Sequence, residues 1–301
     1  MFNKLPFVLL LITVAFSACR QGNSDAEEKS YTKGSVNLVV DETFAPIIED
    51  QLMVFQSAYP NANVQAIYKP ENELLNLLIA DSAKVAVMSR ELTAEEAKFY
   101  QRKQIKIRVN RFAVDGIALI THKNSSDTLV KVQDLLLSMQ GKSGSIKQLV
   151  FDNPNSSTVR YLKELAGVKQ LPSSGIYALK SNPEVIKYVA THPGSIGVIG
   201  INWIDQPDAD LAPYVSDLKV MGVKNLPGKP GDDRYYKPTQ NDLALGLYPL
   251  IRNLYLINCE GGPGPGTGFV TFVASERGQR LILKSGLLPD KIPSREIIIR
   301  K

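Results

Sequence analysis

The sequence predicts an α/β protein in which helices flank a parallel β-sheet. Three strand–helix units follow one another between residues 35 and 100. Runs of β-branched and apolar residues alternate there with segments whose apolar side chains recur at helical spacing. This alternation is typical of a parallel sheet covered by helices. The strand segments are 35–40, 64–68 and 85–88, and the helical segments are 47–59, 71–80 and one that begins after Thr93.

Local signals mark the ends of these helices. Pro46 suits the first turn of a helix, where its missing N–H would have no partner, and Thr43 suits the cap before it. Thr93 and Glu96 have the spacing of a capping box, in which each side chain accepts a hydrogen bond from the other residue's backbone. Pro60 ends the first helix. The boundary signals therefore agree with the apolar periodicity.

Two long extended segments, 107–122 and 243–258, enclose the middle of the chain. A chain of this kind leaves one lobe, builds a second lobe and returns. The two crossings then form a hinge, and the cleft between the lobes forms a binding site. The other expected elements are helices at 129–136, from 155 onward, at 182–192 and at 269–284, strands at 148–151, 196–200 and 297–299, an irregular stretch at 205–242 and a surface loop at 260–268.

The N-terminus has the pattern of a secretory signal. Lys4 precedes an apolar core at 7–16, which is too short to span a membrane. The small residues before Cys19 resemble the lipobox of bacterial lipoproteins, in which the cysteine is acylated. We therefore expect a signal peptide at 1–18, a lipid on Cys19 and a flexible tether at 19–33. An ordinary secreted protein is the alternative.

Composition argues against several classes of protein. The formal net charge is +5, and no basic stripe with interleaved aromatic residues indicates nucleic-acid binding. If Cys19 carries lipid, Cys259 has no disulfide partner, and its apolar surroundings predict a buried thiol. The two histidines, His122 and His192, lie far apart, and no cysteine–histidine spacing is typical of a metal site. We therefore expect no metal, no cofactor and no enzymatic activity.

Polar residues gather where predicted strands turn into helices. In open α/β sheets, ligands lie beyond the carboxyl ends of the strands, so these turns should face one crevice. Hydroxyls, backbone N–H groups at helix starts and one guanidinium suit a small oxyanion. The residues of these turns are Thr43, Phe44, Glu71, Asn72, Ser89, Arg90, Ser156, Ser157 and Thr158.

Two of these features have simpler interpretations. The three hydroxyl residues at 156–158 could serve only as a helix N-cap, although a cap needs one hydroxyl and not three. Arg90 could form a surface ion pair with Glu91 or Glu95. Both alternatives stay open at this stage.

Six blocks of the sequence, in the right order, resemble blocks of the substrate-binding proteins of bacterial phosphate ABC transporters. The resemblance covers nearly all of residues 35–301. It implies a periplasmic-binding-protein-like fold of type II, with lobe I at 34–115 and 250–301, lobe II at 116–249 and a hinge at Asp115 and Gly116. The blocks are Thr43-Phe44-Ala45-Pro46, Val87-Met88-Ser89-Arg90-Glu91-Leu92-Thr93-Ala94-Glu95-Glu96, and the segments 114–118, 194–197, 248–255 and 276–279 with 284–289.

The chain departs from the family at its anion loop. The family loop has an Arg four residues before a Ser-Gly-Thr run, whereas this chain has Asp152 at the position of the Arg and no glycine. Arg90 could supply the missing charge. A carboxylate, Asp152 or Glu71, could accept a hydrogen bond from protonated phosphate and repel sulfate, which carries no proton near pH 7. The resemblance thus implies that Asp152, Asn155, Ser156, Ser157 and Thr158 contribute to the anion site.

The resemblance also implies a function. It indicates a monomer in the periplasm or cell envelope that is anchored to a bacterial membrane by lipid. Such a protein captures inorganic phosphate and delivers it to the membrane permease of an ABC importer, without catalysis. The alternatives are a binding protein for another oxyanion, a phosphate-sensing or surface protein that has lost transport, and a phosphate-ester hydrolase. The last would need paired histidines or clustered aspartates, which this sequence lacks.

Overall fold

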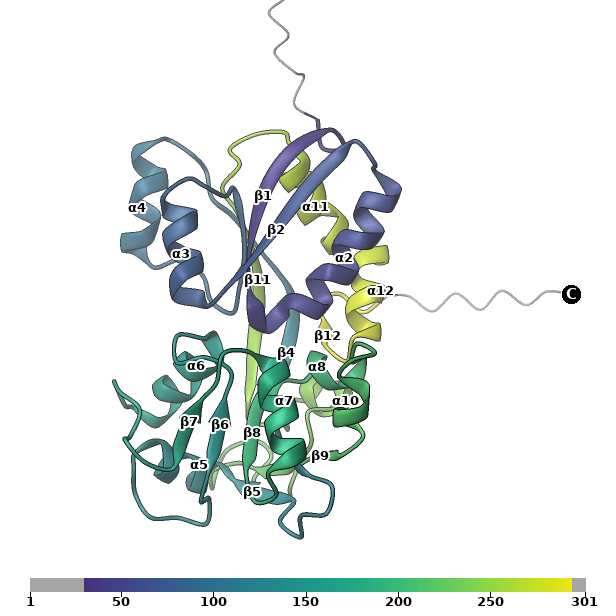
Figure 1. Cartoon of the computed structure of the whole chain (residues 1–301). Coiled ribbons are helices and arrows are strands. Elements are labelled where there is room, and N and C mark those ends of the chain that lie inside the picture. The colour runs from purple at the N-terminus through teal and green to yellow at the C-terminus, as the bar shows by residue number, and fades with distance from the viewer. Residues whose placement is uncertain (1–29, 294–301) are drawn as a thin grey trace, which may run out of the picture.

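A curled β-sheet runs through both lobes of the molecule (Figure 1). The computed structural model describes residues 30–293, and within them ten strands belong to this sheet. The sheet runs in the order β2 (Ala62–Lys69), β1 (Gly34–Asp41), β3 (Val85–Met88), β11 (Ile251–Asn258), β4 (Arg108–His122), β8 (Ile196–Gly200), β6 (Leu149–Phe151) and β7 (Ile176–Ala178), with β12 (Leu288–Pro289) and β9 (Leu218–Val220) also paired to β4. A separate parallel pair joins β5 (Leu129–Lys131) to β10 (Gly222–Lys224).

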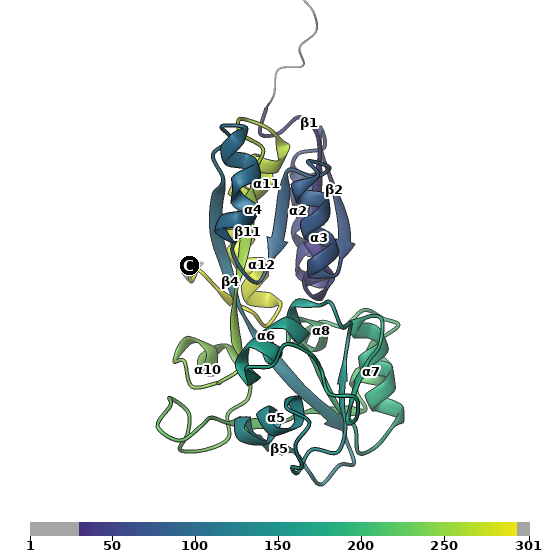
Figure 2. The same cartoon turned by 90° about the vertical axis from the view of Figure 1, so that its left-hand side faces the viewer.

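The first lobe is built on the parallel strands β2, β1 and β3, to which β11 and the first half of β4 are added antiparallel. Helices α3 (Glu71–Ile79) and α4 (Ala94–Arg102) cover one face of this sheet, and α2 (Ala45–Ala58), α11 (Pro265–Ala274) and α12 (Glu276–Lys284) cover the other (Figures 1 and 2). Because both faces are buried, the strands are almost continuously apolar rather than alternating.

The second lobe is built on the parallel strands β8, β6 and β7. Helices α7 (Asn182–Thr191), α8 (Asn202–Asp205) and α9 (Ala212–Val215) pack on one face, in a core that continues into the first lobe. Helices α5 (Val132–Met139), α6 (Ser157–Ala166) and α10 (Gln240–Ala244) pack in a second core on the other face.

Two strands carry the chain between the lobes. The fifteen-residue strand β4 pairs with β11 over its first part, up to Gly116, and with β8 from Ile117 to Ile120. The return crossing lies beside the first, because Ile251 is in register with Gly116 and the Ile117 N–H donates to the Leu250 carbonyl at 2.8 Å. The predicted α/β fold, with two lobes joined by two crossings, is confirmed.

Most of the predicted elements are present, with boundaries shifted by a few residues. Segment 129–136 divides into β5 and the start of α5, and segment 243–258 is not one extended run, because α10 and a turn precede β11. The predicted helix at 269–284 breaks at Ser275, whose hydroxyl caps α12 by accepting a hydrogen bond from the Gly278 N–H. The expected irregular stretch contains α9, β9, β10 and α10. Cys19, the signal segment and the strand expected at 297–299 lie outside the described residues.

The prediction of a surface loop at 260–268 is wrong for its second half. Helix α11 begins at Pro265, and its first four residues are buried. Proline fits this first turn because it needs no hydrogen-bond acceptor there. The Glu260 carboxylate accepts hydrogen bonds from the Gly266 and Thr267 N–H groups, at 3.3 and 2.7 Å, and so satisfies the helix start. The adjacent Cys259 is buried as predicted, and burial raises the pKa of its thiol to about 11.

The glycine at 268 is required by a close backbone approach. A Cβ at Gly268 would lie 1.8 Å from the Tyr31 carbonyl oxygen, whereas a Cβ at Gly262 would meet nothing within 4 Å. We therefore predict that Gly268→Ala lowers the free energy of unfolding in urea by more than about 2 kcal/mol, because the backbone must shift. Gly262→Ala is the matched control and should change it by less than about 0.5 kcal/mol. Equal effects of the two changes would show that α11 does not pack against the Tyr31 backbone in this way.

Candidate functional site

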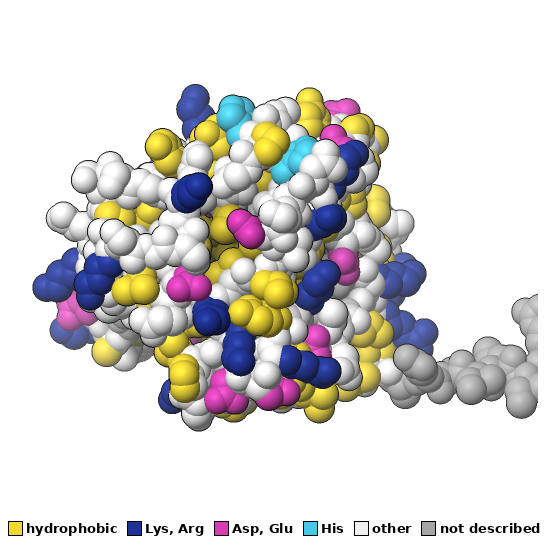
Figure 3. Space-filling model, turned by 90° about the horizontal axis from the view of Figure 1, so that it is seen from below, with side chains coloured by type: hydrophobic (Ala, Val, Ile, Leu, Met, Phe, Trp, Pro, Cys, Tyr) yellow, Lys and Arg dark blue, Asp and Glu magenta, His cyan; other side chains and the backbone are white. Residues whose placement is uncertain are grey.

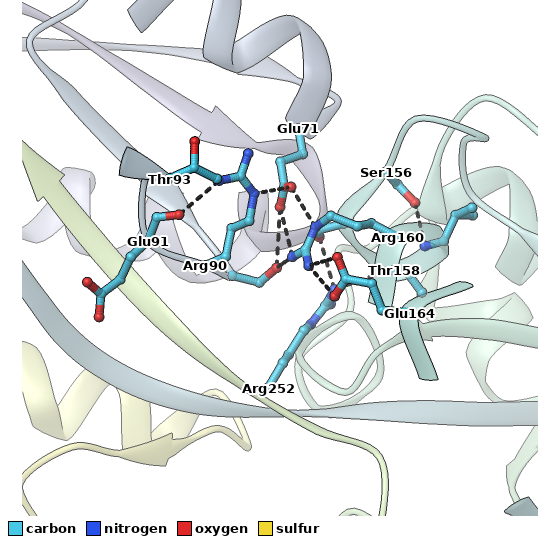
Figure 4. A network of polar contacts seen from close by, with 12 residues as sticks. Glu71, Arg90, Glu91, Thr93, Ser156, Thr158, Arg160, Glu164 and Arg252 are labelled. Atoms are coloured by element: carbon cyan, nitrogen blue, oxygen red, sulfur yellow. Dashed lines mark hydrogen bonds and ion pairs between the residues drawn. The ribbon is translucent and has the colours of Figure 1, made fainter. Parts of the chain in front are cut away.

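Polar side chains are buried between the lobes, where β1, β3 and β6 end beside the crossing strands (Figure 4). Buried polar groups normally have partners, so the concentration of such residues here indicates a binding site rather than a chance grouping. Eleven such residues are at least nine-tenths buried: Asp41, Thr43, Glu71, Asp115, Asp152, Ser156, Ser157, Thr158, Asn182, Asn202 and Arg252.

Arg252 is the buried cation of this site. It lies on β11 directly opposite Asp115 of β4, and its side chain is only 5% exposed. Its Nε and Nη2 each lie 2.8 Å from the Asp115 Oδ2. The guanidinium also stacks over the Phe44 ring, with Cζ 4.7 Å from the ring centroid. The pair therefore fixes a positive charge at the point where the two strands cross between the lobes.

The same guanidinium reaches the start of α6 in the second lobe. Its Nη1 donates to the Ser157 Oγ at 3.0 Å and to the Thr158 Oγ1 at 3.2 Å (Figure 4). Because these hydroxyls accept from arginine, their own hydrogens are left to act as donors. The Ser157 hydroxyl lies beside the Asp41 carboxylate, where a hydrogen bond from it lowers the pKa of Asp41. The N–H groups of the first helical turn also lack intrahelical acceptors. Together these groups make a donor-rich seat at the positive end of a helix dipole, which suits an anion.

Ser156 has a different role from its two neighbours. It is the N-cap of α6, and its Oγ accepts from the Val159 N–H at 3.2 Å. It donates to the Asp152 Oδ1 at 2.7 Å. The simple capping interpretation therefore holds for Ser156 but not for Ser157 and Thr158, which contact the buried arginine.

Asp152 gathers groups from both lobes. Its Oδ2 accepts from the Thr43 hydroxyl of the short helix η2 (Glu42–Phe44) at 3.4 Å and from the Asn182 amide at 3.2 Å. The Thr43 carbonyl in turn accepts from the Trp203 indole N–H at 2.8 Å. Burial raises the pKa of Asp152 above its usual value. The carboxylate at the position of the family's arginine is therefore an acceptor at the interface of the lobes.

Asp41 lies at the end of β1 and has one unsatisfied oxygen. Its Oδ1 accepts from the Thr43 N–H at 3.1 Å, and its buried Oδ2 has no hydrogen-bond partner within residues 30–293. Burial raises the pKa of Asp41 to about 6, and the charge of Glu71 adds to this shift. Arg252 opposes it, as does the nearby Ser157 hydroxyl, whose geometry falls short of a full hydrogen bond to Oδ2. The Oδ1 of Asp115 is also buried without a partner in this part of the chain. The site thus presents free acceptors beside its donors.

A second network closes over this cluster (Figure 4). Glu71 at the start of α3 accepts from the Arg90 Nε at 3.1 Å and from the Arg160 Nε at 2.7 Å. Arg160 belongs to α6 of the second lobe and also donates to the Ser89 Oγ at 2.8 Å. Glu71 and Ser89 belong to the first lobe, so these contacts bind the lobes together.

Arg90 is paired with carboxylates other than the two expected. Its Nη1 and Nη2 donate to the Glu96 oxygens at 2.9 and 2.8 Å, and its Nε donates to Glu71. Arg90 holds the pKa of Glu96 at about 2. Glu91 accepts only through its backbone carbonyl, and no ion pair joins Arg90 to Glu95. A direct contact between Arg90 and an anion therefore stays a prediction.

Asn72 and Asn155 lie apart from the buried cluster. They line an open groove of about 300 Å³ together with Arg160, Lys163 and Lys169. The structure thus brings most of the predicted residues together but places these two at the mouth of the cleft.

The predicted hinge residues lie at the crossing. The Gly116 carbonyl accepts from the Ile201 N–H at 3.1 Å, and a Cβ at Gly116 would lie 2.6 Å from the Pro238 Cβ. Asp115 has a second role as the partner of Arg252. Whether these residues act as a hinge stays a prediction.

Sequence reasoning missed Asp41, Arg160, Asn182, Asn202 and Arg252 as site residues. Arg252 had a usable signal, because it shares the buried face of its strand with Leu254 and Leu256. A charged residue on such a face requires a buried partner. The other four lie on helices or strand ends whose approach depends on the tertiary fold.

The described part of the chain contains neither a cluster of metal-ligating side chains nor a membrane-spanning helix. Between residues 30 and 293, no group of three or more His, Cys, Asp or Glu side chains is placed to hold a metal ion. In that same part of the chain, no helix has both the length and the apolar character needed to cross a bilayer.

Comparison with known proteins agrees with the fold. A family model for a PBP superfamily domain matches residues 25–277. The phosphate-binding protein PstS of Borreliella burgdorferi is 24% identical over 306 residues, which cover 96% of this chain and 99% of that protein. A solved phosphate ABC transporter substrate-binding protein from Clostridium perfringens, with bound phosphate, is 20% identical with a TM-score of 0.68, covering 86% of this chain and all of that one. An ABC-type phosphate transport receptor from Vibrio cholerae is 18% identical with a TM-score of 0.63, covering 85% of this chain and all of that one. The resemblance inferred from the sequence is confirmed.

The raised pKa of Asp41 predicts a pH-dependent stability. Its pKa is about 6 in the folded protein against 3.8 ordinarily, so the folded state favours the protonated form. The resulting stabilisation is complete below about pH 4 and is lost as pH rises through 6. Two pKa units correspond to about 3 kcal/mol. In phosphate-free buffer, the wild type should therefore lose about 3 kcal/mol more unfolding free energy between pH 4 and 7 than Asp41→Asn.

The exposed Asp127 supplies the control for this prediction, because Asp127→Asn is the same chemical change outside the site. Its profile should follow that of the wild type. Parallel profiles for the wild type and Asp41→Asn would mean that Asp41 titrates normally.

Proposed function

The chain belongs to the PBP superfamily, and from this membership we propose that it is a lipid-anchored extracytoplasmic binding protein that captures inorganic phosphate for an ABC importer. The observation that carries the proposal is the seat formed by Arg252, Ser157 and Thr158 between two buried carboxylates, Asp41 and Asp152. The PstS relatives, whose names state that they bind phosphate, support it.

The donors of this seat fit a tetrahedral anion. A phosphate oxygen placed at the start of α6 can accept from the hydroxyls of Ser157 and Thr158 and from the free N–H groups of the first turn. The Nη2 of Arg252 has no hydrogen-bond partner in the described residues, although it contacts Asp115 as an ion pair, and so has donor capacity to spare. Charge-assisted hydrogen bonds of this kind are the strong ones in a buried site.

The acceptors of the site select for a protonated ligand. Phosphate carries a proton near pH 7 and can donate to the free oxygen of Asp41. Sulfate carries none, so its oxygens would face a carboxylate without an intervening hydrogen, and the repulsion would be strong in a dry site. Both oxygens of Asp152 already accept hydrogen bonds, so this carboxylate would contribute only charge repulsion against an unprotonated anion.

Closure of the lobes completes the proposed mechanism, in which no bond is made or broken. We assign lobe I to 34–115 and 250–301, lobe II to 116–249 and the hinge to Asp115 and Gly116. Arg160 bridging to Glu71 and Trp203 bridging to Thr43 would hold the closed form, and separation of these contacts would release the ligand to the permease. The signal segment and a lipid on Cys19 would place a monomer in the periplasm or cell envelope.

One observation favours a second candidate, a binding protein for another oxyanion. The arginine of the family's anion loop is replaced by Asp152, which changes the charge at that position. A protein that only senses phosphate would share the same seat. Measuring which oxyanion binds identifies the ligand but does not distinguish transport from sensing.

The function is tested by thermal unfolding of the purified protein with phosphate, arsenate, sulfate and molybdate at pH 7. A ligand at a hundredfold excess over its Kd stabilises by about 2.7 kcal/mol. We expect phosphate and protonated arsenate to raise the Tm by roughly 5 °C or more, and sulfate to leave it unchanged.

The variant Asp41→Asn is the control for selectivity, because an amide can donate to sulfate. It should narrow the difference between phosphate and sulfate. Stabilisation by sulfate or molybdate but not by phosphate would replace phosphate with another oxyanion, and no shift with any of the four would refute oxyanion binding.

A further inference from the structure

One end of the first lobe carries a concentration of basic residues. We call it the basic end face and define it by six residues with two acidic neighbours, Asp81 and Glu260. The face therefore has a formal charge of +4, whereas residues 30–293 together carry +3, because residues 294–301 contribute +2 of the total of +5 and residues 1–29 contribute none. The rest of the described chain is slightly acidic. The six residues are Lys33, Lys84, Arg102, Lys103, Lys106 and Arg108.

The fold brings these residues together where strands of the first lobe begin. Lys33, Lys84 and Glu260 line one hollow of about 490 Å³. The segment that carries the other four packs against it, since the Ile105 side chain would lie 3.7 Å from a Cβ at Gly261 and Arg108 is in register with Asn258.

The acidic residues of this face are already engaged. Asp81 pairs with Lys84 at 2.6 Å and with Lys103 at 3.2 Å. Glu260 is used as the cap of α11. By contrast, Lys33, Arg102, Lys106 and Arg108 are exposed and form no ion pair within residues 30–293. Four cations therefore face solvent without a neighbouring carboxylate to neutralise them.

The described chain also begins at this end. Ser30 forms a β-bridge with Lys33, just before β1. The start of β1 lies at the top of Figures 1 and 2. Cys19 is eleven residues before Ser30, and eleven residues span at most about 40 Å. Tyr31 and Tyr59, which are 52% and 38% exposed, flank the face. Tyrosine suits the boundary between water and an apolar phase, because its ring is apolar and its hydroxyl is polar.

We propose that the basic end face binds the anionic headgroups of the membrane to which the chain is anchored. This inference rests on the proposed lipid anchor at Cys19, which would keep the face within about 40 Å of the bilayer. Each Lys or Arg near an anionic surface strengthens binding roughly fivefold, and the attraction is confined to about 10 Å by salt. A tether alone would leave the protein free to turn, whereas this contact would set its orientation.

The opposite end of the molecule is shown in Figure 3, where basic and acidic side chains are interspersed. The concentration of unpaired cations next to the tether would therefore set the basic end face against the headgroups, with the inter-lobe site held away from the bilayer.

The test measures binding to vesicles by co-sedimentation, with the chain from residue 19 carrying Cys19→Ala so that neither a lipid nor the apolar signal segment contributes. Vesicles contain phosphatidylcholine with or without 30% phosphatidylglycerol, at about 0.1 M salt. One variant reverses the four unpaired charges of the face: Lys33→Glu, Arg102→Glu, Lys106→Glu and Arg108→Glu. The matched control reverses four exposed lysines of the second lobe: Lys131→Glu, Lys142→Glu, Lys147→Glu and Lys229→Glu.

The proposal predicts that the phosphatidylglycerol-dependent association falls at least tenfold in the face variant and less than threefold in the control. An equal fall in both variants, or no dependence on phosphatidylglycerol in the parent chain, would overturn it. Phosphate-induced thermal stabilisation, measured on the same preparations, should be unchanged by both sets of substitutions. Its loss in the parent chain would count against the proposed function and not against the membrane contact.

Discussion

The ion pair between Arg252 and Asp115 is the interaction on which the rest of the site depends. The pair joins the two crossing strands and is almost fully buried. From there the Arg252 guanidinium also donates hydrogen bonds to the start of α6. Burial of two charges is costly, and such a pair contributes little net stability when all its hydrogen bonds are made. Removal of either partner would, however, leave an uncompensated charge in the interior, so the arrangement is strongly constrained. The pair holds one positive charge where both lobes contribute groups.

Around this cation the site also carries three buried carboxylates. Asp41, Asp115 and Asp152 are all fully buried, and burial raises the pKa of each. An unprotonated anion would meet repulsion there, while an anion that carries its own protons would satisfy the free oxygens. The outer arginines, Arg90 and Arg160, are both paired with glutamates, and of these two only Arg160 forms contacts from one lobe to the other within the described residues.

The sequence was sufficient for the fold and for part of the site. Apolar periodicity and helix caps located the strand–helix units of the first lobe, because these signals are local. Thr43, Ser157 and Thr158 were found since they follow strands in a known type of sheet. Local signals failed at α11, where a Gly–Pro run that suggested a surface loop packs against Tyr31. They failed also for Asp41 and Arg160, whose roles depend on partners far away in the sequence.

Titration of phosphate by calorimetry into three proteins tests the central claim most directly. They are the wild type, Arg90→Gln, and the double variant Asp115→Asn with Arg252→Gln, which removes the cation without leaving a buried charge unpaired. If Arg252 supplies the charge of the seat, the double variant should lose at least about 100-fold in affinity, the magnitude of one to two charge-assisted hydrogen bonds. Arg90→Gln should lose less than about tenfold. The reverse order, or unchanged binding by the folded double variant, would contradict this account.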